Sequence, residues 1–128
     1  MNQDGKIMEY RILFQQLQKI QQNVQAVEQH LDELKKIQEN LETLRTLKSN
    51  TETFIPLGSG LFLKGTIAET ETLLMNVGSH ICIEKKLPEA VEAVQKQAIE
   101  IEQLLTQLEE EATDVSTQLE HLRAEIES

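Results

Sequence analysis

The chain has 128 residues and a formal net charge of −10, from 22 Asp and Glu against 12 Lys and Arg. It contains no Trp, one Tyr and three Phe, although large aromatic side chains dominate the buried surface of ordinary globular cores. This composition argues against a compact globule. The acidity argues against binding to nucleic acids or to anionic membranes, because both attract cationic side chains.

The negative charge is concentrated toward the C-terminus. Residues 1–50 carry seven basic and seven acidic side chains, whereas residues 87–128 carry two basic and eleven acidic side chains, a net charge of −9. A solvated helix face is one explanation for this acidity. Electrostatic steering toward a basic partner is the other.

Residues 5–50 have the pattern of a long coiled-coil helix. Apolar residues recur at alternating intervals of three and four, the heptad spacing of residues that face a partner helix. The interval of three that ends at Leu34 is followed by a second one, which predicts a stammer, a local overwinding of the supercoil. An isolated helix of this kind is marginal in water, so we expect the apolar stripe to be buried on a partner. The stripe consists of Tyr10, Leu13, Leu17, Ile20, Val24, Val27, Leu31, Leu34, Ile37, Leu41, Leu44 and Leu47.

Four apolar residues near the start of this helix lie outside the stripe. They are Ile7, Met8, Ile12 and Phe14, and the outer face that follows them is rich in Gln. Single exposed apolar residues are ordinary, whereas four within eight residues at one helix end suggest a contact surface. We expect this surface to hold a partner or a client, meaning an unfolded polypeptide. A local packing contact, or a frayed end without a role, is the alternative.

Residues 53–86 predict two β-hairpins. The strands are expected at 54–57, 61–67, 72–77 and 81–85, with a glycine-containing turn inside each pair. Pro56 has no backbone N–H, which places the first strand at a sheet edge or beside a bulge. Gly78 can adopt the positive φ that tight hairpin turns require.

Hairpins this short are barely stable alone, and apolar strand edges tend to pair with further strands. We therefore expect an oligomer in which several chains combine their hairpins into a shared sheet or barrel. The apolar residues expected at this interface are Phe54, Ile55, Leu57, Leu61, Phe62, Leu63, Ile67, Leu74, Val77, Ile81 and Ile83.

Residues 87–127 predict a second long helix. Pro88 and Glu89 suit a first helical turn. Two helices of similar length on either side of a reversal predict an antiparallel two-helix coiled coil with two β-hairpins at the bend. The fold class is thus mainly α with a small β region, and residues 1–128 are expected to form a single domain. The stripe of the second helix is Leu87, Val91, Val94, Ala98, Ile101, Leu105, Leu108, Ala112, Val115, Leu119, Leu122 and Ile126.

No group of residues suggests catalysis. His30, His80 and His121 are far apart in sequence, whereas a metal site needs three or four converging ligands. The single Cys82 is expected to be a small packing residue, and a lone cysteine fits a reducing compartment. The Gly58-Ser59-Gly60 turn precedes a strand, whereas a phosphate-binding loop precedes a helix. We predict no catalytic residues, no metal and no cofactor.

The sequence also predicts a cytoplasmic location. The first residues are polar, and the apolar residues that follow are periodic, unlike the continuous apolar run of a signal peptide. No stretch approaches the ~20 apolar residues of a membrane-spanning helix.

The two hairpins resemble those of a known family. Residues 54–65, FIPLGSGLFLKG, resemble the first hairpin of prefoldin α-type subunits, where a Pro-hydrophobic-Gly turn precedes an apolar strand that ends in Lys. Residues 76–85, NVGSHICIEK, resemble the second hairpin, although His80 stands where Gly or a small residue is common. Possession of two hairpins is typical of the α class, because β-type subunits have one.

The resemblance implies a hexamer of two α-type and four β-type subunits, in which the hairpins form a double β-barrel that carries six coiled coils. It implies that the ends of the coiled coils bind clients without ATP and transfer them to a group II chaperonin. On this chain, the client-binding surface would combine Ile7, Met8, Ile12 and Phe14 with Leu119, Leu122 and Ile126.

Two other functions are compatible with long helices. A structural coiled-coil scaffold would have the same architecture without client binding. An RNA-binding helical arm is opposed by the net charge of −9 in residues 87–128.

Overall fold

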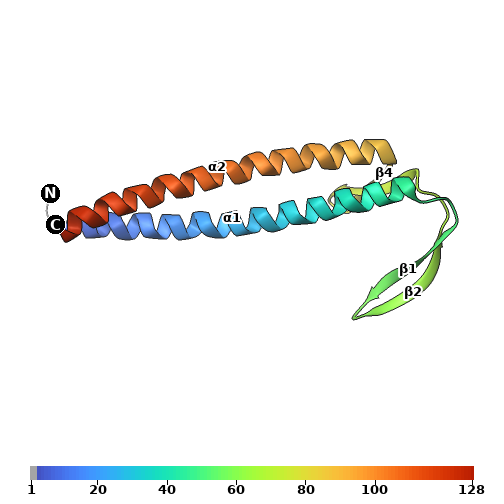
Figure 1. Ribbon diagram of the computed structural model, residues 1–128, viewed down its shortest axis with the longest axis horizontal. Helices are drawn as coiled ribbons and strands as arrows, with labels where there is room; N and C mark the ends of the chain where they lie inside the picture. Colours follow the sequence, from blue (N-terminus) through green and yellow to red (C-terminus); the bar gives the residue numbers. More distant parts are fainter. Residues whose placement is uncertain (1–2) are drawn as a thin grey trace. The chain divides into compact units, whose positions relative to one another are not determined.

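Two long helices flank two β-hairpins along the chain (Figure 1). The computed structural model describes residues 3–128. The mainly α fold with a small β region is the fold class that the sequence predicts. The helices are α1, Gln3–Thr46, and α2, Leu87–Glu127; the strands are β1, Thr51–Gly58, β2, Leu61–Ile67, β3, Thr72–Gly78, and β4, Ile81–Lys86.

The chain forms two compact units, each of which contains parts of both helices. The first unit joins the start of α1, up to Glu33, to the part of α2 from Ala98 onward, and the second unit comprises residues 34–97. In the first unit, the start of α1 (blue in Figure 1) lies beside the end of α2 (red), and the two run antiparallel.

The core of the first unit is a single stripe between the two helices. Ile20 of α1 is buried against Val115 and Leu119 of α2. The half-buried residues packed against this cluster all belong to the predicted stripes: Tyr10, Leu13, Leu17, Val24 and Ala112. The heptad spacing therefore identified the residues that hold this unit together.

In the second unit, buried residues also come from both helices. Leu34 and Leu41 of α1 and Leu87, Ala90 and Val94 of α2 are each less than 9% exposed. A shallow groove of about 210 Å³ is lined from both helices, by Gln38, Leu41, Glu42, Val91 and Gln95. All twelve stripe positions of α2 are buried or half-buried.

The predicted stripe of α1 is wrong at one position. Ile37 is 43% exposed, and the adjacent Gln38 is half-buried in its place. Between Leu34 and Leu41, the alternation of four and three residues selects position 38, because a residue at 37 is rotated by about 100° from it around the helix. The prediction chose the more apolar of two adjacent residues, whereas in the structure Ile37 faces solvent and the Gln38 amide lies at the interface.

Each hairpin forms a separate two-stranded antiparallel sheet, β1 with β2 and β3 with β4. The register shifts just before the turn in both hairpins, between Pro56 and Gly58 in the first and between Asn76 and Gly78 in the second. An irregularity in the first strand is among the predictions made from Pro56, but the second hairpin has the same shift without a proline. Ile55 lies across the backbone of Gly65, where a Cβ atom would be 2.8 Å from the Ile55 Cδ1 atom. Gly65 therefore leaves space for the side chain of Ile55.

Backbone hydrogen bonds also form at the base of each hairpin, next to the segments that lead to and from the helices. Asn50, with a φ of 66°, donates its N–H to the Ile67 carbonyl at 2.6 Å. The N–H of Leu87, at the start of α2, donates to the Glu71 carbonyl at 2.8 Å. Because the first N–H groups of a helix have no partner within the helix, this contact satisfies one of them.

The two hairpin turns have the same backbone conformation. Ser59 and Gly60 have φ values of 50° and 79°, and Ser79 and His80 have values of 50° and 62°. Two consecutive residues with positive φ are characteristic of the type I′ turn, whose twist matches that of the strands. His80 thus adopts a conformation that glycine adopts without steric cost.

We predict that replacement of Leu119 by Ala destabilises the helical pair by about 2–3 kcal/mol, because it leaves a cavity in a thin core. Leu119 is 7% exposed. Ile99 on the same helix is exposed, so Ile99→Ala serves as the matched control and should cost less than about 0.5 kcal/mol. Denaturant unfolding followed by helical circular dichroism measures both. Equal losses would contradict the assigned core.

The turn conformations predict opposite effects for two substitutions. His80→Gly should stabilise the second hairpin by up to about 1 kcal/mol, because glycine relieves the strain of a positive φ. Gly60→Ala should destabilise the first hairpin by about 1 kcal/mol for the same reason. Hydrogen exchange of the strand amides measures each hairpin separately. A destabilising effect of His80→Gly would show that the histidine makes a compensating contact.

Candidate functional site

The candidate site is the tip, which we define as residues 3–14 of α1 together with residues 118–128 of α2. Among the described residues, a hydrogen bond and an ion pair join the helices here. The Gln3 side-chain amide donates to the Ile126 carbonyl at 3.1 Å, and the Lys6 ammonium lies 3.6 Å from the Glu125 carboxylate. Lys6 is half-buried and Glu125 is exposed, and an ion pair at the protein surface contributes at most about 1 kcal/mol. These polar contacts therefore contribute little to holding the tip closed.

Four apolar side chains of α1 are exposed at the tip. Ile12 is 58% exposed, and Ile7, Met8 and Phe14 also belong to the exposed large hydrophobic residues. Phe14 stacks on Tyr10, with ring centroids 6.4 Å apart and planes inclined by 13°. Tyr10 itself is half-buried and packs against the core. The stacking fixes Phe14 at the flank of the interface, where its other surface is open to solvent.

These residues occupy two faces of α1. With about 100° between successive residues, Ile7 and Phe14 lie close to the side that carries Tyr10, at the flank of the helix interface. Met8 and Ile12 lie on the outer side of the helix, away from the interface. The heptad positions of the four residues in the sequence predict the same two pairs, with Ile7 and Phe14 on the flank and Met8 and Ile12 facing away.

The α2 residues predicted to bind clients are less accessible than those of α1. Leu119 and Leu122 are buried in the interface between the helices, and Ile126 is half-buried. Because these side chains face α1, clients could reach Leu119 and Leu122 only if the helices separated. Their role in client binding remains a prediction, and the accessible apolar surface of the tip comes mainly from α1.

Two grooves run along the tip, one on either side of the helix interface. The larger, of about 510 Å³, is lined by Ile7, Tyr10, Arg11, Arg123, Ile126 and Glu127. The smaller, of about 300 Å³, is lined by Glu9, Leu13, Gln118, His121, Leu122 and Glu125. The first combines apolar side chains with two guanidinium groups, whereas the second carries two carboxylates and no basic residue other than His121.

The sequence analysis did not identify Arg11 or Arg123 as site residues. Arg123 forms an ion pair with Glu127 at 3.2 Å. A signal for Arg11 was present in the sequence, because none of its helical neighbours at i±3 and i±4 is acidic: they are Met8, Phe14, Ile7 and Gln15. A charged side chain that has no oppositely charged neighbour on its own helix can form an ion pair with another molecule.

The hairpins expose a second apolar surface. Phe54 is 66% exposed and Leu74 is 70% exposed, and the other predicted interface residues are exposed as well, except for the half-buried Ile67. The first hairpin is apolar on both faces, because Ile55 pairs with Leu63 while Phe62 pairs with Pro56 on the other face. Several hundred Å² of contiguous apolar surface normally indicate an interaction site.

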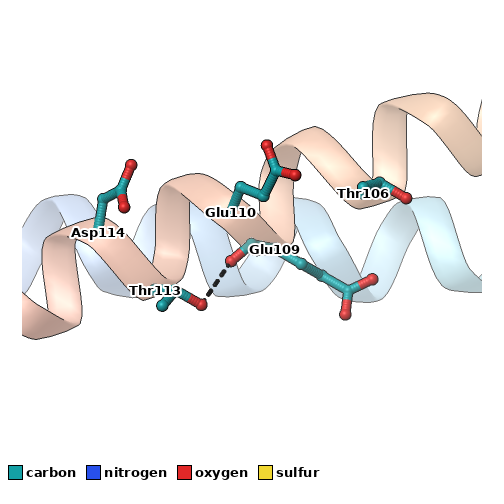
Figure 2. A pocket seen from close by; sticks show the side chains of 5 residues that line it. All are labelled: Thr106, Glu109, Glu110, Thr113 and Asp114. Atoms are coloured by element: carbon teal, nitrogen blue, oxygen red, sulfur yellow. Dashed lines mark hydrogen bonds between the residues drawn. The ribbon is translucent and has the colours of Figure 1, made fainter.

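The middle of α2 carries an acidic face. Figure 2 shows Glu110 and Asp114 on one side of the helix and Glu109 extending away from them, beside Thr106 and Thr113. The Thr113 hydroxyl donates to the backbone carbonyl of Glu109 at 3.0 Å. Within residues 3–128, no three acidic, His or Cys side chains are grouped closely enough to bind a metal ion. The carboxylates diverge into solvent, as expected for a solvated helix face.

The histidines and the cysteine do not form a site among the described residues. His30 is exposed on α1, His80 at the turn between β3 and β4, and His121 on α2. Cys82 was expected to be a packing residue, but it is exposed on β4 opposite Asn76. Neither α1 nor α2, as described, has an apolar stretch long enough to cross a membrane.

Comparison with known sequences identifies similar proteins over almost the whole chain. A family model described as prefoldin subunit matches residues 13–128. The prefoldin subunit alpha of Thermofilum pendens is 30% identical over 120 residues, which are 94% of this chain and 90% of that protein. The prefoldin subunit alpha of Thermococcus onnurineus is 34% identical over 93 residues, 65% of this chain and 57% of that protein.

Solved structures share the fold. Filamentous PFD from Methanocaldococcus jannaschii, determined by cryo-EM, aligns with a TM-score of 0.77 and 19% identity over 91% of this chain and 96% of that chain. The crystal structure of the prefoldin beta subunit from Thermococcus strain KS-1 aligns with a TM-score of 0.64 and 19% identity, over 97% and 88% of the two chains. At these identities, the structural similarity concerns the fold alone.

Proposed function

Because the chain belongs to the prefoldin family, and its curated relatives are alpha subunits, we propose that it binds clients at its tip without ATP and transfers them to a group II chaperonin. Prefoldins are co-chaperones that assemble with other prefoldin subunits, and they are not enzymes. The observation that carries the proposal is the exposure of Ile7, Met8, Ile12 and Phe14 together at one end of α1, where the rest of the helix exposes only the single large apolar side chain of Ile37 among the described residues.

The tip would hold clients by shielding their apolar side chains from water. Full burial of an Ile or Phe side chain contributes about 1.5–3 kcal/mol, and the exposed tip residues offer only part of that because one side of each already contacts the helix. Such contacts are non-directional and accept many sequences. Each tip would therefore bind weakly, and several tips of one complex would act together on one unfolded chain.

The hairpins would provide the assembly of the complex. Their strand edges are unpaired beyond the two-stranded sheets, and their apolar side chains are exposed on the isolated chain. Pairing with hairpins of β-type subunits would bury both. We expect two copies of this chain and four of a β-type subunit, joined in a double β-barrel. The cytoplasmic location also stays a prediction.

Client binding at the tip predicts that Ile12→Ser combined with Phe14→Ser weakens the suppression of aggregation. Loss of about 1.4 kcal/mol of binding free energy corresponds to a tenfold weaker affinity, and two truncated side chains exceed this if both contact the client. The measurement is light scattering from a denatured test protein diluted into the assembled complex. The double variant should need about ten times more complex for the same suppression.

The control for this experiment is Ile99→Ser, which removes a comparably exposed apolar side chain outside the tip. It should behave as the unaltered complex does. If the Ile12→Ser, Phe14→Ser double variant suppressed aggregation as well as the unaltered complex does, the chain would be a structural scaffold subunit. Client binding would then have to be assigned to other subunits.

Assembly through the hairpins predicts that Phe62→Asp combined with Leu74→Asp abolishes the complex, because charges cannot be buried in an apolar interface without a partner. Native mass spectrometry of the chain co-expressed with its β-type partner should show free subunits. Glu52→Gln is the control: Glu52 is exposed and only forms a surface ion pair with Lys64 at 3.5 Å. A hexamer formed by the double variant would exclude this interface.

A further inference from the structure

The two grooves of the tip differ in charge, and this difference bears on which client segments can bind. The larger groove has three aliphatic or aromatic residues in its lining, Ile7, Tyr10 and Ile126. Its charged residues are Arg11, Arg123 and Glu127. Since Arg123 and Glu127 neutralise each other at 3.2 Å, the groove has a net charge of +1, carried by Arg11.

The guanidinium group of Arg11 is available to an external anion. Arg11 is exposed, and within residues 3–128 it forms no ion pair. Its helical neighbours at i±3 and i±4 are uncharged, so rotation of its side chain along α1 would not find a carboxylate. Arginine presents a planar set of donors that matches both oxygens of a carboxylate.

A positively charged groove contrasts with the rest of the protein. The chain has a net charge of −10. The groove on the other side of the tip is lined by Glu125, which pairs with Lys6, and by Glu9, which forms no ion pair within residues 3–128. A client segment with acidic residues would be repelled by that second groove and by the acidic α2. The larger groove is the part of the tip that complements such a segment in charge.

We propose that this groove selects extended client segments in which an apolar side chain lies next to Asp or Glu. The apolar side chain would contact Ile7, Tyr10 and Ile126, and the carboxylate would pair with Arg11. The inference rests on the proposed function, because it specifies the substrate class of the same tip. It gives the tip a preference where apolar contacts alone would accept any apolar segment.

The preference should be modest and sensitive to salt. Exposed ion pairs of this kind typically favour binding by about two- to fivefold, and a Debye length of about 3 Å at 1 M salt removes most of the attraction between exposed charges. Discrimination between acidic and neutral segments is therefore expected at physiological ionic strength and should disappear at high salt.

The test compares two fluorescent peptides that differ only in the residue that follows each leucine. Both are unstructured and contain the same leucines, each followed by Asp in one peptide and by Asn in the other. Binding to the assembled complex is measured by fluorescence anisotropy. The Asp peptide should bind two- to fivefold more tightly than the Asn peptide. Arg11→Gln should abolish that difference while the affinity for the Asn peptide stays within twofold.

The matched control is Lys19→Gln, which removes one exposed positive charge from the same helix outside the groove. It should leave the preference for the Asp peptide intact. An undiminished preference in Arg11→Gln would overturn the inference, and so would an equal loss of affinity for both peptides, which would indicate a structural role of Arg11.

Failure of the proposed function would look different. If neither peptide bound to the complex, and the Ile12 and Phe14 substitutions had no effect on aggregation, the tip would not bind clients at all. If both peptides bound equally to the unaltered complex, client binding would stand and only the selectivity assigned to Arg11 would fall.

Discussion

The structure depends on one stripe of apolar side chains on each helix. A two-helix interface has no interior in the sense of a globular core, because each side chain is covered from one direction only. Consistent with this, the buried residues retain 3–8% exposure, and no large side chain in residues 3–128 is below 2%. The interface is long enough to hold the helices together, but it can cover nothing except the stripe itself. Apolar residues elsewhere on the chain need another partner.

This constraint explains why both the hairpins and the tip expose apolar side chains, although their expected roles differ. In both places apolar side chains lie outside the stripe, and the chain has no further layer to cover them. At the hairpins, unpaired strand edges accompany the apolar surface, so that a permanent partner can satisfy backbone and side chains together. At the tip there is only helical backbone, whose hydrogen bonds are already made, and what remains is side-chain surface. Such a surface suits reversible binding.

The sequence was sufficient to predict the elements and most of the core, because heptad spacing translates directly into one helix face. It failed where two adjacent residues competed for that face: Ile37 is the more apolar, yet the geometry selects Gln38. It also could not distinguish core from surface at the end of α2, where Leu119 and Leu122 satisfy the stripe and were also assigned to the client surface. The grooves depend on which α2 residue lies beside which α1 residue, and the flanking Gln and Glu residues do not encode that register. Arg11 therefore acquired its neighbours Arg123 and Ile126 only in three dimensions.

The negative charge of the chain opposes the self-association that its exposed apolar surface would otherwise cause. A helix pair with uncovered Ile, Met and Phe side chains would associate with its own copies if nothing opposed it. A net charge of −9 over residues 87–128 provides that opposition, since like charges keep copies apart in solution. The same repulsion would act on acidic client segments, which would then be excluded from an otherwise permissive tip. In the larger groove, Arg11, which forms no ion pair within residues 3–128, reverses the sign of the charge at the point of contact, while the net charge of the chain remains strongly negative.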